Sequence, residues 1–183
     1  APPPSTGSLV FSGLRALMNL TEQTDHQELL ARAMLKMFSD RRRGFGNLQG
    51  EGTAHTAESA ETTSLCTLDS EGNAVCLTYS NNNHSGVVIP GTGILMNNQM
   101  ALFSPWPNNP NEVSRGKRPV SSMMPSIILK NNSVKLVLGA SGSTRIPTSL
   151  MQVLYRFFLQ NKSLIDAITC LLYTSDAADE RLS

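Results

Sequence analysis

The strongest constraint on the fold is a pair of alternating segments joined by a short polar turn. Residues 62–80 read TTSLCTLDSEGNAVCLTYS, and apolar and small polar side chains alternate on both sides of DSEGN. Such alternation is typical of two paired β-strands. The turn fits a three-residue hairpin loop with Gly72 in the left-handed conformation, which glycine adopts without strain. Asp69 is then expected to pair with Asn73, and this pair sets the register of the hairpin.

This register predicts which side chains share one face of the hairpin. Because side chains alternate along a strand, partners at every second position project from the same side. The pairs predicted on this side are Thr62–Ser80, Ser64–Thr78, Cys66–Cys76 and Leu68–Ala74. A second hydroxyl, that of Ser80, is therefore expected directly opposite Thr62. The facing cysteines form either a strained cross-strand disulfide or two small buried thiols, and we favour the thiols.

The chain before this hairpin is predicted to be helical and then flexible. Residues 5–38 have helical periodicity, with Asp25 and Glu28 at the spacing of a capping box. Residues 44–61 contain several glycines and almost no apolar periodicity, which predicts a flexible segment. The apolar positions of the helical region are Leu9, Gly13, Leu14, Leu17, Met18, Leu29, Leu30, Ala33, Met34 and Met37.

The chain after the hairpin is predicted to add strands and a helix. A short strand is expected near residues 93–96, and a second hairpin over 126–139 with Asn131 and Asn132 in its turn. The helix that follows carries Leu150, Val153, Leu154, Phe157 and Phe158 at helical spacing. Strands followed by a helix indicate a layered α+β architecture.

Composition narrows the classes of function. The 183 residues suffice for one domain with a full core, and 40% apolar and 16% charged residues are ordinary for a globular protein. A net charge of +1 predicts no nucleic-acid partner, and the three arginines at 41–43 are interpreted as a solvated helix end. No apolar stretch has the length needed to span a bilayer. Cys66 and Cys76 lack C-x-x-C spacing and the three histidines lie far apart, so we expect no zinc site and no cofactor.

The two ends of the sequence are unusual. The chain opens on APPPSTG without a methionine, so the missing signal peptide says little about the compartment. The segment CLLYTSDAADE near the other end resembles the translation of a transposase adapter used to prepare sequencing libraries. We therefore exclude residues 170–183 from the fold prediction and expect the chain to be a fragment.

Several motifs together resemble a known family. TTSLCTLDSEGNAVCLTYSNN, GTGILMNNQM, GKRPVSSMMPSIIL and LVLGASGSTRI are similar to the small subunit of γ-glutamyltranspeptidases, and PPPSTG to a motif near the end of their large subunit. The resemblance implies an αββα sandwich of the N-terminal-nucleophile hydrolase type, incomplete in this chain. It also implies self-cleavage between Glu61 and Thr62. Residues 1–61 would end the large subunit, and residues 62–169 would form most of the small one.

The resemblance assigns the nucleophile to Thr62. Cleavage would expose an α-amino group with a pKa near ~8 on the same residue, and this group can take the proton of the threonine hydroxyl. Ser80 matches the second hydroxyl that supports the nucleophile, where the family usually has threonine. Thr63 is the rival nucleophile, but it is expected on the opposite face from Ser80. A plain strand start at Thr62 is the alternative.

The remaining site residues are also implied by resemblance. The amides of Gly142 and Ser143 would stabilise an oxyanion, unless GASGST is only a helix-entry turn; the family usually has glycine in place of Ser143. Ser121 and Ser122 match the pair that contacts the substrate α-carboxylate, and Asn82 and Gln99 match residues that hold its α-amino group. Serines and asparagines at such positions often cap turns instead.

One position departs from the family pattern. Leu102 stands where the family has a carboxylate for the α-ammonium of the substrate, and loss of that bond would weaken γ-glutamyl binding about 10- to 100-fold. We expect a γ-glutamyl transferase or hydrolase that acts on glutathione-like amides, with water or an amine as acceptor. The alternatives are a glutaryl-type amide acylase and a non-catalytic homologue. Further expectations are a partner in the rest of its own large subunit and a periplasmic or extracellular location.

Overall fold

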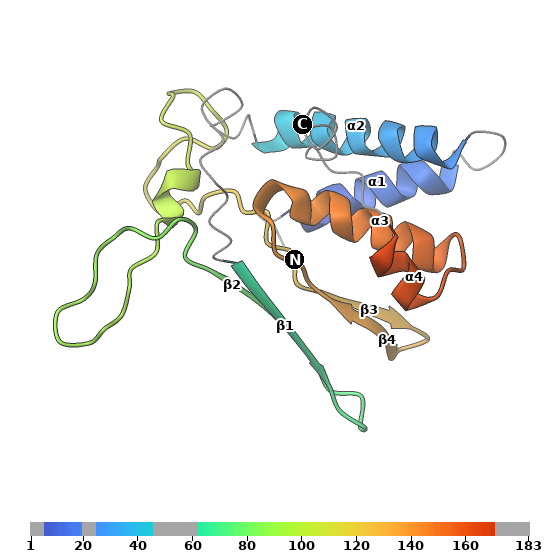
Figure 1. Ribbon diagram of the computed structural model, residues 1–183. Helices are drawn as coiled ribbons and strands as arrows, with labels where there is room; N and C mark the ends of the chain where they lie inside the picture. Colours follow the sequence, from blue (N-terminus) through green and yellow to red (C-terminus); the bar gives the residue numbers. More distant parts are fainter. Residues whose placement is uncertain (1–5, 20–24, 46–61, 171–183) are drawn as a thin grey trace, which may run out of the picture.

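The computed structural model describes residues 6–19, 25–45 and 62–170 (Figure 1). Within these ranges the chain forms helices, two antiparallel hairpins and two short 3-10 turns. In chain order they are α1 (Gly7–Asn19), α2 (His26–Phe45), β1 (Thr62–Leu68), β2 (Ala74–Ser80), η1 (Gln99–Leu102), β3 (Ser126–Lys130), β4 (Ser133–Leu138), η2 (Ser143–Arg145), α3 (Ile146–Phe158) and α4 (Leu164–Thr169). The segment before Thr62 that was predicted to be flexible lies outside the described residues from position 46 on, as does the tail from 171.

The first hairpin, β1–β2, has the predicted register. Thr62 pairs with Ser80 and Cys66 with Cys76, and the Asp69 N–H donates to the Asn73 carbonyl at 3.1 Å. Gly72 has a φ of +89°, in the region that other residues rarely adopt. The Asp69 carboxylate closes the turn by accepting from the backbone N–H groups of Glu71 and Asn73 at 2.9 and 2.8 Å. The turn chemistry read from the sequence therefore determines the register.

The second hairpin, β3–β4, is also confirmed. Asn131 and Asn132 have φ angles of 52° and 61°, which is the left-handed pair of a two-residue type I′ turn. The pairing shifts between Ile128 and Leu129, where a bulge interrupts the ladder.

The two hairpins pack face to face and form two β layers. The Cys76 thiol donates to the Leu138 carbonyl at 3.1 Å. Gly139 follows directly and lies against Ser64, so closely that a Cβ atom on Gly139 would overlap the Ser64 hydroxyl oxygen. Figure 1 shows β3–β4 between the helices and β1–β2. The described residues thus hold the two sheets and one helical layer of an αββα sandwich.

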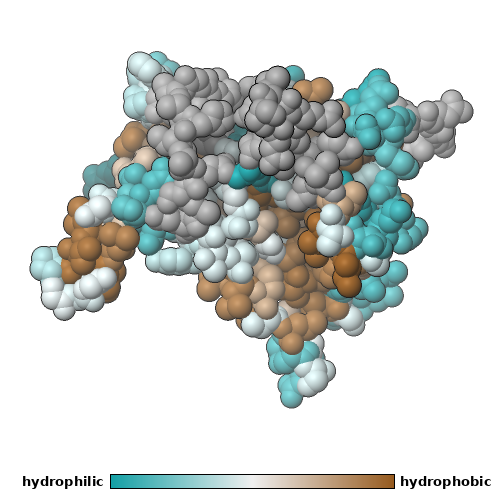
Figure 2. Space-filling view, in the orientation of Figure 1, coloured by the Kyte–Doolittle hydropathy of each residue, from teal (hydrophilic) through white to brown (hydrophobic). Residues whose placement is uncertain are grey.

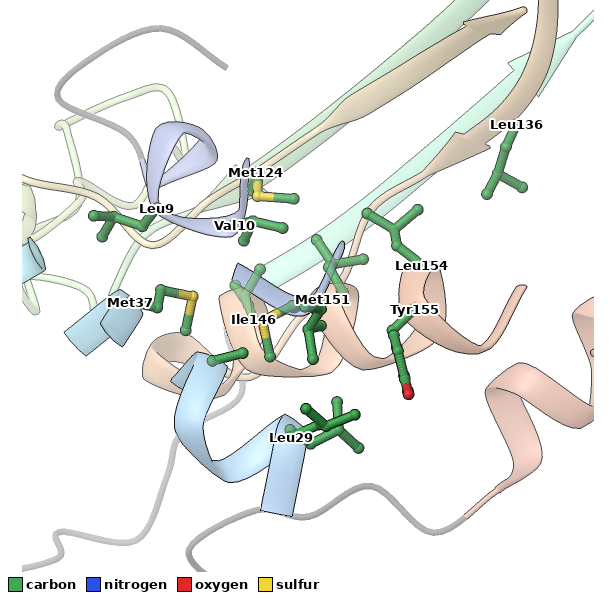
Figure 3. Close-up of a cluster of buried hydrophobic side chains, with 14 residues drawn as sticks. Leu9, Val10, Leu29, Met37, Met124, Leu136, Ile146, Met151, Leu154 and Tyr155 are labelled. Atoms are coloured by element: carbon green, nitrogen blue, oxygen red, sulfur yellow. The ribbon is translucent and has the colours of Figure 1, made fainter. Parts of the chain in front are cut away.

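The main hydrophobic core lies between the helices and β3–β4 (Figure 3). Gly13 allows α1 to approach α3, because a Cβ atom there would lie 2.6 Å from the Met151 sulfur. The Tyr155 hydroxyl shares a 2.7 Å hydrogen bond with Nδ1 of His26 at the start of α2. The buried apolar side chains of this core are Leu9, Val10, Leu17, Leu29, Leu30, Ala33, Met37, Met124, Leu136, Ile146, Leu150, Met151, Leu154 and Tyr155.

Three predictions about the helical region are wrong in detail. The region forms two helices, and α2 begins directly after Asp25, where the capping-box spacing predicts a helix start, but α2 continues to Phe45, beyond the predicted end at residue 38. Met18 was expected on the apolar face, but its side chain is 62% exposed. Arg41 was expected in solvent with its neighbours, but it is only 6% exposed because it packs beside Ser122, whose Oγ lies 3.5 Å from its Nη2.

Two predictions about the strands also need correction. The cysteines are free thiols with their sulfur atoms 3.2 Å apart, but Cys66 is exposed rather than buried. Residues 93–96 form no regular strand; a single bridge joins Val88 to Leu95.

Among the described residues, no helix combines the length and the apolar character of a membrane span. The same residues contain no group of three or more histidine, cysteine or acidic side chains that could hold a metal ion.

Candidate active site

The candidate nucleophile lies at the open end of the first hairpin. The Thr62 hydroxyl donates to the Ser80 hydroxyl at 2.9 Å. Pairs alternate along an antiparallel ladder, and counting from the hydrogen-bonded pair Asp69–Asn73 makes Thr62–Ser80 a pair without backbone hydrogen bonds. Side chains approach most closely at such positions. The register therefore brings these two hydroxyl groups into contact.

Ser80 connects the nucleophile position to two candidate substrate residues. Its hydroxyl accepts from the backbone N–H of Asn82 at 3.0 Å, and its carbonyl accepts from the Gln99 side-chain amide at 3.0 Å. The Asn82 amide donates in turn to the Asn98 carbonyl at 3.1 Å. Both side chains use their NH₂ groups on the backbone, so their carbonyl oxygens are the groups suited to accept from a substrate ammonium. Thr62, Ser80, Asn82 and Gln99 form one connected group.

The candidate oxyanion turn lies toward the same end of the hairpin. Leu138, the last residue of β4, lies beside Cys76, and Gly139 lies beside Ser64, so the chain advances toward Thr62 as it approaches Gly142. Gly142 and Ser143 have φ angles of 115° and 49°. Successive residues in such a turn direct backbone N–H groups into a concave site that favours an anion. The helix-entry alternative is also present, because η2 and α3 follow at once.

The two candidate carboxylate-contacting serines belong to a second group. The Ser121 hydroxyl accepts from the Met123 N–H at 3.1 Å, which is the turn-capping role left open above. The Ser122 carbonyl accepts from the Thr6 hydroxyl at 3.2 Å. This turn is therefore anchored on the start of α1, and through Arg41 on α2.

Leu102 lies on the same side of η1 as Gln99. The two residues are the first and last of a four-residue 3-10 helix, in which side chains three positions apart eclipse one another. Leu102 is half-buried, and its carbonyl accepts from the Asn111 side-chain amide at 2.7 Å. The apolar side chain therefore stands beside the amide expected to hold the substrate ammonium.

Asn111 is the site residue that the sequence analysis did not find. It is buried in a loop and bonds to both the Leu102 and the Val120 backbones. No periodicity or turn signal distinguishes it from the other asparagines of the same loop, because its role depends on contacts between distant segments.

Comparisons with known proteins show the family to which this chain is similar. A family model for γ-glutamyltranspeptidase matches residues 47–177. The glutathione hydrolase proenzyme of Escherichia coli (strain K12) is 41% identical over 108 residues, which cover 52% of this chain and 19% of that protein. The acylase ACY 1 proenzyme of Pseudomonas sp. (strain SE83) is 34% identical over 146 residues, which cover 76% of this chain and 26% of that protein. The chain thus spans about a fifth to a quarter of these relatives.

A solved structure gives the same result for the fold. The γ-glutamyltranspeptidase of Pseudomonas nitroreducens complexed with L-DON superposes with a TM-score of 0.57 at 35% identity, over 64% of this chain and 77% of that chain. The fold is that of the N-terminal-nucleophile hydrolases. The chain belongs to the γ-glutamyltranspeptidase family.

Proposed function

We propose that this chain is part of a self-processing enzyme that transfers or hydrolyses γ-glutamyl groups of glutathione-like amides, with Thr62 as the nucleophile. The observation that carries the proposal is the 2.9 Å contact between the Thr62 and Ser80 hydroxyl groups at the open end of β1–β2. Membership of the family supports the reaction class, because the relatives that match include glutathione hydrolases.

Cleavage before Thr62 would create the catalytic base. The freed α-amino group has a pKa near ~8, so it is partly neutral at physiological pH and can take the proton from Oγ1 of the same residue. In the uncleaved chain that proton is donated to Ser80; after cleavage it is directed to the α-amino group, and the Ser80 hydroxyl donates to Oγ1 instead and holds it in place. Oγ1 then attacks the amide carbon of the donor, which forms a C–O bond and a tetrahedral oxyanion.

The second half of the reaction releases the amine and regenerates the enzyme. The Gly142 and Ser143 N–H groups stabilise the oxyanion, and the proton held by the α-amino group passes to the leaving nitrogen as the C–N bond breaks. The product is a γ-glutamyl ester on Thr62. Water or an amine attacks this ester, and Thr62 takes back its proton.

Recognition of the donor divides between the two groups of polar residues. Asn82 and Gln99 accept from the α-ammonium, and Ser121 and Ser122 donate to the α-carboxylate. Leu102 weakens the binding of the substrate α-ammonium, because its side chain offers no charged partner. An acylase that removes a glutaryl group is therefore the second candidate, and the acylase relative favours it.

The experiment compares two donors in the full-length protein. A γ-glutamyl anilide and its glutaryl analogue differ only in the α-amine, so the ratio of their kcat/KM values isolates that group. We expect hydrolysis of both to require Thr62, and the γ-glutamyl compound to be favoured by less than about 100-fold, the upper value of one charged hydrogen bond. A larger preference would refute the interpretation of Leu102. Full activity of a Thr62→Ala protein would refute the proposed nucleophile.

A variant that restores the carboxylate also tests the role of Leu102. Leu102→Asp would place a carboxylate beside Gln99, and only a donor with an α-amine gains from it. The kcat/KM ratio should rise for the γ-glutamyl compound by about 10-fold or more. Folding and processing must be checked first, because an unpaired buried carboxylate is costly. An unchanged ratio in a folded, processed variant would mean that Leu102 does not line the pocket.

A further inference from the structure

The polar side chains buried in this structure are concentrated around the two candidate substrate segments. Among the described residues, buried polar side chains lie at Thr6, Arg41, Ser104, Asn111, Thr148, Gln152 and Arg156. Ser104 and Asn111 lie within residues 102–122, which contain Leu102, Ser121 and Ser122, and Thr6 and Arg41 both contact Ser122. Buried polar groups are costly unless they are hydrogen-bonded, so such a concentration needs a physical reason.

Asn111 is at the centre of this concentration. Its side chain is 1% exposed, its Nδ2 donates to the Leu102 carbonyl at 2.7 Å, and its Oδ1 accepts from the Val120 N–H at 3.1 Å. Its own carbonyl accepts from the Ser104 N–H at 2.8 Å. One side chain thus satisfies backbone groups on two segments that no regular strand or helix connects.

These contacts link the two ends of the proposed donor site. Leu102 ends η1, whose first residue is Gln99, the candidate contact for the ammonium. Val120 directly precedes Ser121, the candidate contact for the carboxylate. The Asn111 amide therefore bridges the segment that carries the ammonium contact and the segment that carries the carboxylate contact.

We propose that Asn111 is a positioning residue that holds Gln99 and Ser121 at the separation required by an acyl donor carrying an amine and a carboxylate on the same carbon. This inference rests on the proposed function and adds to it a determinant of the substrate class. Donors that carry both groups benefit from a fixed separation, because both contacts form without a further loss of loop entropy. Donors with only one of the groups gain nothing from that separation.

The test uses three anilides in the full-length protein: γ-glutamyl, glutaryl without the amine, and 4-aminobutyryl without the carboxylate. Asn111→Asp replaces only the side-chain NH₂ group by an oxygen, so it keeps the acceptor for the Val120 N–H and removes the donor to the Leu102 carbonyl. We expect KM for the γ-glutamyl anilide to rise about tenfold with kcat nearly unchanged, since Asn111 touches no reacting atom. The two single-contact donors should change by less than about threefold. Asn108→Gly, at an exposed position of the same loop with a φ of 61°, is the matched control and should behave as wild type.

Each outcome of this test has a defined meaning. Equal losses on all three donors, or a fall in kcat at constant KM, would show a structural role and overturn the proposal. If Asn111→Asp does not fold, Asn111→Ser, whose side chain is too short to bond to both Leu102 and Val120, should give the same selective rise in KM; failure of both variants to fold would also overturn the proposal. A wild-type protein inactive on all three donors would refute the proposed function itself. An active wild type with unchanged ratios in the Asn111 variants would refute this inference alone.

Discussion

Gly142 and Ser143, the two residues that form the turn before α3, have positive φ angles of 115° and 49°. A side chain with a Cβ atom is strained in this region, by roughly 1–2 kcal/mol per residue. Ser143 carries that strain, and this accounts in physical terms for the glycine usually found there in the family. The strain is local, so it can be tested by changing single residues.

We predict that Ser143→Gly raises the free energy of unfolding by about 0.5–1 kcal/mol, which is the relieved strain less the entropy that glycine loses on folding. Gly142→Ala should lower it by at least about 1 kcal/mol. Urea unfolding of both variants measures the difference. A destabilising Ser143→Gly substitution would contradict the account of this turn.

A second prediction at the residue scale concerns Cys66. The neighbouring atoms partly desolvate the Cys66 sulfur, although the residue as a whole is exposed, and its thiol shares a hydrogen bond with the Cys76 sulfur; together these raise the pKa of the Cys66 thiol to about 11. The thiolate is the reactive form, so the thiol should be protonated and slow to react at neutral pH. The intrinsic nucleophilicity of a high-pKa thiolate offsets part of this loss, which leaves alkylation roughly tenfold slower than for an ordinary free thiol at pH 8.

Mass spectrometry of the peptide containing Cys66 after timed iodoacetamide treatment measures that rate. The rate should keep rising from pH 8 toward pH 11, while circular dichroism confirms that the fold is retained. A rate that levels off by pH 9 would show that the pKa is not raised.

At the scale of elements, the contact between the hairpins depends on Gly139. Its Cα lies so close to the Ser64 hydroxyl that no side chain fits between the two sheets. We predict that Gly139→Ala costs about 1–3 kcal/mol, the usual range for overpacking, and moves β4 away from β1–β2. The turn at Gly142 would move with it, so activity should fall as well.

The double variant Gly139→Ala, Ser64→Gly tests that explanation. Removal of the Ser64 side chain makes room for the added methyl group and should recover part of the lost stability, as measured by urea unfolding. Additive losses in the double variant would mean that the two residues are not in contact.

The elements differ in how far their sequence predicts them. The hairpin registers follow from local turn chemistry at Gly72, Asn131 and Asn132, so they could be read directly from the sequence. The burial of Arg41 could not, because it depends on the distant Ser122 rather than on the run of arginines that surrounds it. The role of Asn111 could not be predicted for the same reason. Contacts between distant loops leave no periodic signal.

At the scale of the whole molecule, one face of β1–β2 is apolar and exposed. Four large apolar side chains point away from β3–β4, and each is more than half exposed: Leu65, Val75, Leu77 and Tyr79. Figure 2 shows apolar surface over this region of the molecule. The relatives are about four to five times longer than the segment they share with this chain. We expect a second helical layer, from the remainder of the large subunit, to cover this face.

The central claim is that Thr62 becomes an N-terminus, and N-terminal sequencing of the purified full-length protein tests it most directly. The account predicts two chains from one precursor, the smaller beginning Thr-Thr-Ser-Leu, and a Thr62→Ala protein that stays a single chain. A smaller chain that begins elsewhere, or a Thr62→Ala protein that still divides at Glu61, would contradict it.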